Sequence, residues 1–267
     1  MSKTIQIIIN PDSGNDEPIL SFISDTFRDT DIVWDVAVTK KKNDAFDYAK
    51  KALEQNVDIV GVYGGDGTVM QVARALFQTT KPLIIFPGGT ANVMAKELGI
   101  PENSKMALEL IRDGKYQSKV IDMGMCNDQP FVLRVNAGTL ATMVQDATVG
   151  LKETIGQAAY AVAAIKQLVQ PQLHTYSLKI DGKEIGIQGV SLSIANSGNV
   201  GIPGVSFLPG INISDGLLDV IVFKNDNIQS LVSWAGSAVT GNEPNDSIEH
   251  WKAKEIFVTF DSDETVM

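Results

Sequence analysis

Two short glycine-rich segments in the first part of the chain carry residue types that can hold phosphate groups. One is Gly64-Gly65-Asp66-Gly67-Thr68, and the other is Gly88-Gly89-Thr90-Ala91-Asn92. Glycine permits a positive φ and lets a phosphate come close to main-chain N–H groups, which can then bind its oxygens. The Asp66 carboxylate adds a group that can bind magnesium or join a polar network beside a phosphate. The two segments therefore predict a site for a phosphorylated ligand.

Each glycine segment stands between a predicted buried strand and a predicted helix. The first segment follows Ile59–Tyr63 and precedes apolar residues at helical spacing within 69–77. The second follows Leu83–Phe86, and either Thr90 or Asn92 is suited to cap the helix that comes next. A turn in this position lies at the positive end of a helix dipole, where anions bind favourably. We expect both loops to open on the same edge of one sheet.

A third loop, Asn10-Pro11-Asp12-Ser13-Gly14, follows the predicted strand Thr4–Ile9. In an open parallel sheet, ligands bind beyond the carboxyl ends of the strands. A single glycine pair after a strand is commonly no more than a tight connection, so one such motif would be weak evidence. Three polar or glycine-rich loops in the same position indicate a binding site.

The pattern of apolar residues changes near Asp122. Before it, short apolar strands alternate with helical patterns, which predicts a parallel α/β domain over residues 1–122. After it, strand patterns dominate and include a hairpin about an Asp181-Gly182 turn. The exception is one long helical pattern at about 151–170. We expect an all-β domain, a sandwich or an open barrel, over residues 123–267.

Composition excludes several classes of protein. The chain has 267 residues, 44% of them hydrophobic, which is enough to bury a sizeable core. It contains no apolar run approaching the ~18 residues of a membrane span and no signal segment at the amino terminus. Cys126 is the single cysteine, so no intrachain disulfide can form, and His174 and His250 lack a metal-type spacing. Because a lone cysteine suits a reducing compartment, we expect a cytoplasmic enzyme, and the net charge of −10 argues against a nucleic-acid partner.

Over nearly its whole length the chain resembles the diacylglycerol kinase catalytic-domain family, which includes bacterial lipid kinases and sphingosine kinases. The resemblance rests on the three loops and on further motifs that follow them in the family's order. These motifs are Thr39, Leu98-Gly99-Ile100-Pro101, Ile121-Asp122-Met123-Gly124, Gly156-Gln157-Ala158-Ala159-Tyr160 and Asp215-Gly216-Leu217-Leu218-Asp219. The resemblance implies an NAD-kinase-like α/β domain and a β-sandwich domain, with nucleotide in the cleft between them and the lipid entering from the second.

The resemblance also implies an activity, which is ATP-dependent transfer of the γ-phosphate to a diacylglycerol-like or sphingoid hydroxyl, with Mg²⁺ bridging the phosphates. Asp66 and Asp122 would then be the catalytic residues, within a network of water, metal and phosphate. The lipid substrate would require transient contact with a membrane surface, so the protein could be peripheral at the membrane. The implied nucleotide-binding residues are Asn10, Ser13, Thr39, Gly64, Gly65, Asp66, Gly67, Thr68, Gly88, Gly89, Thr90 and Asn92.

By the same resemblance, a metal site would combine the Asp215 carboxylate with the main-chain carbonyls of Asn212 and Leu217. Oxygen ligands of this kind suit magnesium. Taken alone, Asp215-Gly216 is typical of a plain turn that enters a strand. Both interpretations stay open at this point.

Two other functions also stay open: a nucleotide-binding or lipid-binding protein with little turnover, and an NAD kinase, which shares the Gly-Gly-Asp-Gly motif. Members of the resembled family carry a late Asp-Gly-Glu whose aspartate is the general base. Here the sequence reaches Met267 about where that segment should begin, so we expect the segment beyond Met267. The alternatives are that Asp261 or Asp263 replaces its aspartate, that catalysis differs, or that the protein is not a kinase. Neither the lipid nor the oligomeric state follows from the sequence.

Overall fold

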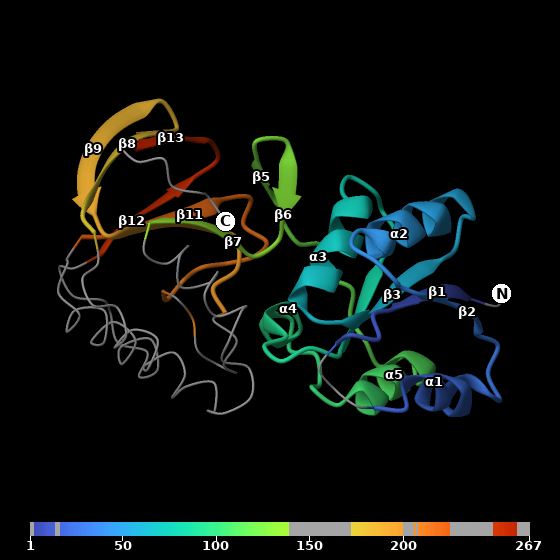
Figure 1. The fold of residues 1–267 in the computed structure, drawn as a ribbon. Coiled ribbons are helices and arrows are strands. Elements are labelled where there is room, and N and C mark those ends of the chain that lie inside the picture. The colour runs from blue at the N-terminus through green and yellow to red at the C-terminus, as the bar shows by residue number, and fades with distance from the viewer. Residues whose placement is uncertain are drawn as a thin grey trace. The chain divides into compact units, whose positions relative to one another are not determined.

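The computed structural model describes residues 3–13, 17–138, 172–199, 206, 208–224 and 248–260, and the chain divides into two compact units between Val132 and Leu133. Figure 1 shows the elements of each unit. Those of the first unit are β1 (Thr4–Ile9), α1 (Ile19–Phe27), β2 (Val33–Val38), α2 (Asp44–Glu54), β3 (Ile59–Gly64), α3 (Asp66–Ala75), β4 (Leu83–Pro87), α4 (Val93–Glu97), α5 (Ser104–Arg112), β5 (Gly124–Cys126) and β6 (Gln129–Phe131).

The first unit is built on a parallel sheet with the strand order β2-β1-β3-β4. Helices α1 and α5 cover one face of this sheet, and α2 and α3 cover the other (Figure 1). Every residue of β3 is buried, as is usual for a central strand that helices cover on both sides. The predicted parallel α/β arrangement is confirmed.

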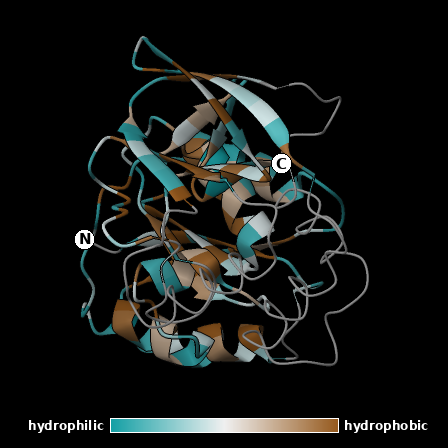
Figure 2. Cartoon of the chain, turned by 90° about the vertical axis from the view of Figure 1, so that its left-hand side faces the viewer, coloured by the Kyte–Doolittle hydropathy of each residue, from teal (hydrophilic) through white to brown (hydrophobic). Residues whose placement is uncertain are grey.

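The helices pack on the sheet through narrow apolar faces. In α2 the buried residues Ala45, Ala49 and Ala52 recur at helical spacing, while the exposed positions carry lysines and acidic residues. Figure 2 shows the same mixture as brown and teal patches along the helices. The small alanine side chains let α2 come close to the sheet, so the helix is held by burial on one side only.

The strand order of the first unit reverses direction between β1 and β3. The chain leaves β1 toward β2 on one side, then crosses back to β3 on the other side of β1. The loops that follow β1 and β3 therefore diverge to helices on opposite faces of the sheet. Such a switch in strand order opens a crevice at the carboxyl ends of the two strands.

The described strands of the second unit form two antiparallel sheets, with the orders β12-β11-β10-β7 and β13-β8-β9. Its strands are β7 (Arg134–Gly138), β8 (His174–Ile180), β9 (Lys183–Gly189), β10 (Ser191–Ala195), β11 (Leu218–Phe223), β12 (Ile248–Ala253) and β13 (Ile256–Phe260). Apolar residues from both sheets, among them Tyr176, Leu178, Leu192 and Val220, form one buried cluster. This is the predicted sandwich-like domain. The predicted helix at 151–170, with the 156–160 motif, and Asp261 and Asp263 lie outside the described residues.

The Asp181-Gly182 turn and the boundary between the units were both predicted from the sequence. The Asp181-Gly182 hairpin is confirmed, because Ile180 pairs with Lys183 and both turn residues have positive φ, 46° and 87°. The division between the units comes later than the predicted boundary after Asp122. The β5–β6 hairpin is responsible, since β6 packs against α3 of the first unit. Among the described residues, no helix is long and apolar enough to cross a membrane.

Candidate functional site

Asn10 joins the carboxyl ends of three neighbouring strands. Its main-chain N–H donates to the Tyr63 carbonyl at the end of β3, at 3.0 Å. Its side-chain Nδ2 donates to Thr68 Oγ1 at 2.9 Å, and its Oδ1 accepts a longer bond of 3.4 Å from Thr39 Oγ1. Thr39 follows β2 and Thr68 lies in the first turn of α3. The structure thus brings together three of the predicted nucleotide-binding residues at the switch point.

The loop after β1 folds back on Asn10 and buries a hydroxyl group. The N–H of Ser13 donates to the Asn10 carbonyl at 3.2 Å, and the N–H of Asp12 donates to Asn10 Oδ1 at 3.1 Å. Ser13 Oγ is inaccessible to solvent and has no hydrogen-bond partner within the described part of the chain. Leaving a buried polar group unpaired costs free energy. Ser13 Oγ is therefore suited to donate to an oxygen of a bound ligand.

The two glycine segments touch each other through their main chains. The N–H of Gly88 donates to the Gly64 carbonyl at 3.1 Å. A Cβ atom at Gly89 would lie only 2.5 Å from Gly65 Cα, whereas one at Gly65 would lie 3.4 Å from Gly89 Cα. Gly89 is thus required because the neighbouring main chain leaves no room for a side chain. This close approach leaves both segments without side chains where they meet.

Asn92 and Asp66 hold the second glycine segment in place. Asn92 is the N-cap residue of α4, one of the two predicted alternatives, and has a left-handed φ of 47°. Its side chain does not cap the helix but bonds back to Gly89, accepting from N at 2.9 Å and donating to O at 2.7 Å. Instead, Asp66 Oδ1 accepts from the N–H of Met94 in α4, at 3.1 Å. An aspartate in one helix therefore caps the next helix.

Three further predicted residues of the first unit are Gly67, Thr90 and Asp122. Gly67 is exposed in the first turn of α3, and Thr90 is exposed in the second glycine segment. Asp122 lies partly buried in the connection between α5 and β5. Sequence reasoning missed Met94, whose contribution is a main-chain N–H and so leaves no signal in the residue type.

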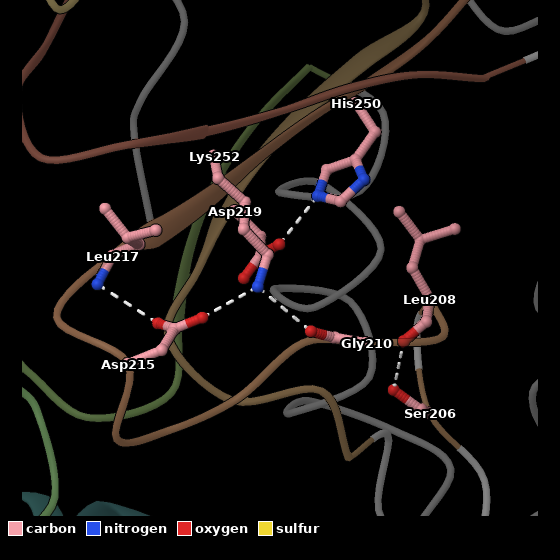
Figure 3. Close-up of polar contacts among 8 residues, drawn as sticks. All are labelled: Ser206, Leu208, Gly210, Asp215, Leu217, Asp219, His250 and Lys252. Carbon is pink, nitrogen blue, oxygen red and sulfur yellow. Dashed lines mark hydrogen bonds and ion pairs between the residues drawn. The ribbon is translucent and has the colours of Figure 1, made fainter.

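The predicted metal residues belong to a loop of the second unit, and Figure 3 shows its contacts. Asp215 Oδ1 accepts from the N–H of Leu217 at 3.1 Å, and Asp215 Oδ2 lies 2.7 Å from Lys252 Nζ. Lys252 Nζ also donates to the Gly210 carbonyl at 3.0 Å. The hydrogen bond to Asp215 raises the pKa of Lys252, and the nearby Asp219 carboxylate contributes to that rise. The Asn212 side chain accepts from the N–H of Ser214 at 3.1 Å.

Asp219 and His250 form a second carboxylate contact next to this loop. The Asp219 side chain is 1% exposed, and its Oδ1 lies 2.6 Å from His250 Nε2 (Figure 3). His250 belongs to β12, which pairs with β11 so that Asp219 stands opposite Lys252. Within the described ranges, no group of three or more His, Cys, Asp or Glu residues could hold a metal ion. The residue pattern does not indicate these pairs, because they depend on how β12 pairs with β11.

Two family models match the chain, one in each unit. The family model described as "Diacylglycerol kinase catalytic domain" matches residues 4–126. The one described as "YegS C-terminal NAD kinase beta sandwich-like domain" matches residues 134–267.

Individual relatives are similar over most of this chain. The uncharacterized protein sll0036 of Synechocystis sp. is 32% identical over 97% of the chain, which spans 63% of that protein's length. The diacylglycerol kinase of Bacillus subtilis (strain 168) is 28% identical, with 96% of this chain and 86% of that protein covered. A Bacillus anthracis (strain Sterne) crystal structure, provisionally assigned as a diacylglycerol kinase, has a TM-score of 0.82 at 27% identity, covering 99% and 89% of the two chains. The chain belongs to the diacylglycerol kinase catalytic-domain family, and its second unit is the YegS-type C-terminal domain.

Proposed function

We propose that this protein is an ATP-dependent lipid kinase that transfers the γ-phosphate of ATP to a lipid hydroxyl. The observation that carries the proposal is the joining of three loops at the switch point of the sheet, where Asn10 bonds to Thr39 and Thr68. Main-chain groups, hydroxyls and an unpaired buried Ser13 Oγ meet there. This combination suits the phosphates of a nucleotide. Membership in a family named for diacylglycerol kinases supports ATP as the donor.

The residues of the joined loops divide into two roles in this proposal. The main-chain N–H groups of the glycine segments and of the first turn of α3 bind phosphate oxygens, each such charge-assisted bond contributing ~1.5–3 kcal/mol. The buried Ser13 Oγ and the hydroxyl of the exposed Thr90 donate to the nucleotide. Asn10, Thr39 and Thr68 contact the nucleotide and also hold the loops together through their hydrogen bonds. The predicted nucleotide-binding residues thus work as one unit, because each loop positions its neighbour.

Two aspartates complete the proposed catalytic network. Magnesium bound with ATP would offset the charge that develops on the phosphates. Asp66 has one carboxylate oxygen fixed by the N–H of Met94, so its other oxygen can orient water or ligands beside the phosphates. We assign Asp122 to the same network on the strength of its motif. A separate metal position at Asn212, Asp215 and Leu217 stays a prediction.

The proposed acceptor is a lipid with a free hydroxyl, of the diacylglycerol-like or sphingoid class. Family membership is its support. Because such a lipid resides in a bilayer, we propose a cytoplasmic protein that contacts the membrane surface transiently.

The assay is phosphate transfer from γ-labelled ATP to diacylglycerol, to sphingosine and to NAD, in parallel reactions with mixed detergent micelles. We expect a labelled lipid product, and we expect Asp66→Ala to lose it. Labelled NADP in place of lipid would assign the chain as an NAD kinase. Binding of ATP without any labelled product would identify a binding protein and reject the kinase proposal.

A further inference from the structure

The Asp215 loop offers oxygen ligands for a cation, but a cation of the protein itself already bonds to them. Lys252 Nζ lies 2.7 Å from Asp215 Oδ2 and 3.0 Å from the Gly210 carbonyl oxygen. Figure 3 shows the ammonium group between these two oxygens. One carboxylate and one main-chain carbonyl are the same ligand types that a magnesium site in this loop would use.

The other oxygen of Asp215 is occupied as well. Asp215 Oδ1 accepts from the N–H of Leu217 at 3.1 Å, which closes the turn locally. A magnesium ion prefers six oxygen ligands at ~2.0–2.1 Å. To reach Asp215 Oδ2 it would have to displace Lys252, because an ammonium group and a divalent ion at neighbouring positions repel each other. The contacts of the described residues therefore do not fit the predicted metal site.

Strand pairing fixes Lys252 in this position. In the β11–β12 ladder Lys252 stands directly opposite Asp219, two positions from the pair formed by His250 and Ile221. The same strand thus supplies Lys252 to Asp215 and His250 to Asp219. The Lys252 side chain is 35% exposed and that of Asp215 is 21% exposed, so the pair is partly shielded from water.

We infer that Lys252 is the resident cation of the Asp215 loop and takes the place of a divalent ion there. The loop from Gly210 to Leu217 closes through this ammonium group, and the second unit requires no metal at Asp215. The inference goes beyond the proposed function and is independent of it. Any magnesium requirement of the protein then belongs to the bound nucleotide alone.

Thermal unfolding of the nucleotide-free protein tests the inference. We expect the wild type to unfold at the same temperature in EDTA and in excess MgCl₂. Lys252→Met removes the cation and should lower the midpoint by about 2–4 °C in EDTA, and MgCl₂ should restore part of the loss by binding the vacated Asp215. The double variant Lys252→Met/Asp215→Asn should show no restoration. Lys254→Met is the matched control, since it removes an exposed lysine from the same segment and should not respond to MgCl₂.

Binding of Mn²⁺ to the nucleotide-free protein, followed by electron paramagnetic resonance, gives a measurement that does not depend on how Lys252→Met folds. We expect wild type and Asp215→Asn to bind the same amount of Mn²⁺. An Mn²⁺ site in the wild type that disappears in Asp215→Asn would overturn the inference. A Lys252→Met variant whose midpoint is unchanged, or is lowered without any recovery in MgCl₂, would also overturn it.

Discussion

Replacing Gly89 by alanine should force the two glycine segments apart. The new Cβ atom would lie 2.5 Å from Gly65 Cα, against 3.4 Å or more for an ordinary contact. The atom it meets is main chain and cannot rotate away, so the segments must separate by about 0.9 Å, the difference between these distances. Overpacking of this kind costs about 1–3 kcal/mol of unfolding free energy.

The same displacement should weaken nucleotide binding. Gly89 also holds Asn92 through two hydrogen bonds, so a shift of its main chain moves the start of α4. A misplacement of about 1 Å can cost up to roughly 100-fold in the function of a pre-organised site. We therefore expect Gly89→Ala to lower the melting temperature by several degrees and ATP affinity by about 10-fold to 100-fold, measured by calorimetry with MgCl₂.

Two further alanine variants make this prediction specific to the contact. Gly65→Ala places its Cβ 3.4 Å from Gly89 Cα, which is an ordinary contact, so this variant should keep the wild-type stability. Gly186→Ala in β9 meets no atom within 4 Å and should change neither stability nor ATP affinity. The reasoning is refuted if Gly65→Ala and Gly89→Ala destabilise the protein equally, or if Gly89→Ala binds ATP like the wild type.

Three other variants test single contacts of the first unit. Asp66→Asn keeps an oxygen that can accept from the N–H of Met94, so it should retain the melting temperature while losing activity by about 10-fold to 100-fold. Asp66→Ala should in addition lose about 1 kcal/mol of helix capping. Equal activity of Asp66→Asn and wild type would contradict the proposed role of Asp66. Asn10→Ala should cost about 1–3 kcal/mol in urea unfolding, because it leaves the partly buried Thr68 hydroxyl without its donor, and an unchanged midpoint would contradict this. The pKa of Asp58 lies below its ordinary value of 3.8, mainly because its carboxylate accepts from the N–H of Thr4. The contribution of Asp58 to folding stability is therefore present above pH 3.8 and is lost as the pH falls through the lowered pKa. Asp58→Asn should therefore melt below the wild type at pH 7, and the gap should close below about pH 4; a gap independent of pH would contradict the assignment.

The fold and the position of the site could be predicted because they follow from periodicity and chain order. The apolar run Ile59–Tyr63 has the composition of a strand buried on both faces, and β3 is such a strand. Parallel strands joined through helices place their loops on one edge. The loops that begin at Asn10 and Gly64 were therefore expected at the same edge, and the bond between Asn10 and Thr68 shows that they meet there.

Contacts that depend on loop geometry or strand register could not be predicted in this way. The cap that Asp66 provides to Met94 exists because Asn92 adopts a left-handed conformation and turns its side chain toward Gly89. The pair of Asp215 and Lys252 joins residues 37 positions apart, and it depends on the turn that precedes β11 as well as on the register of β11 against β12. The β5–β6 hairpin has the strand pattern of the second unit but packs with the first, which shifted the boundary.

The glycine-rich loops of the first unit and the Asp215 loop of the second unit differ in their source of positive charge. The segments 10–14, 64–68 and 88–92 contain no lysine or arginine, in a chain whose net charge is −10. The N–H groups and hydroxyls of these segments carry no full positive charge, so a metal ion bound with the nucleotide would offset the phosphates there, beside Lys40, Lys41 and Lys42, which directly follow Thr39. The second unit has the opposite arrangement, because Lys252 supplies a positive charge to Asp215 from within the chain. A dependence of activity on magnesium would consequently report on the nucleotide, and it should follow the concentration of the metal–nucleotide complex rather than that of the free ion.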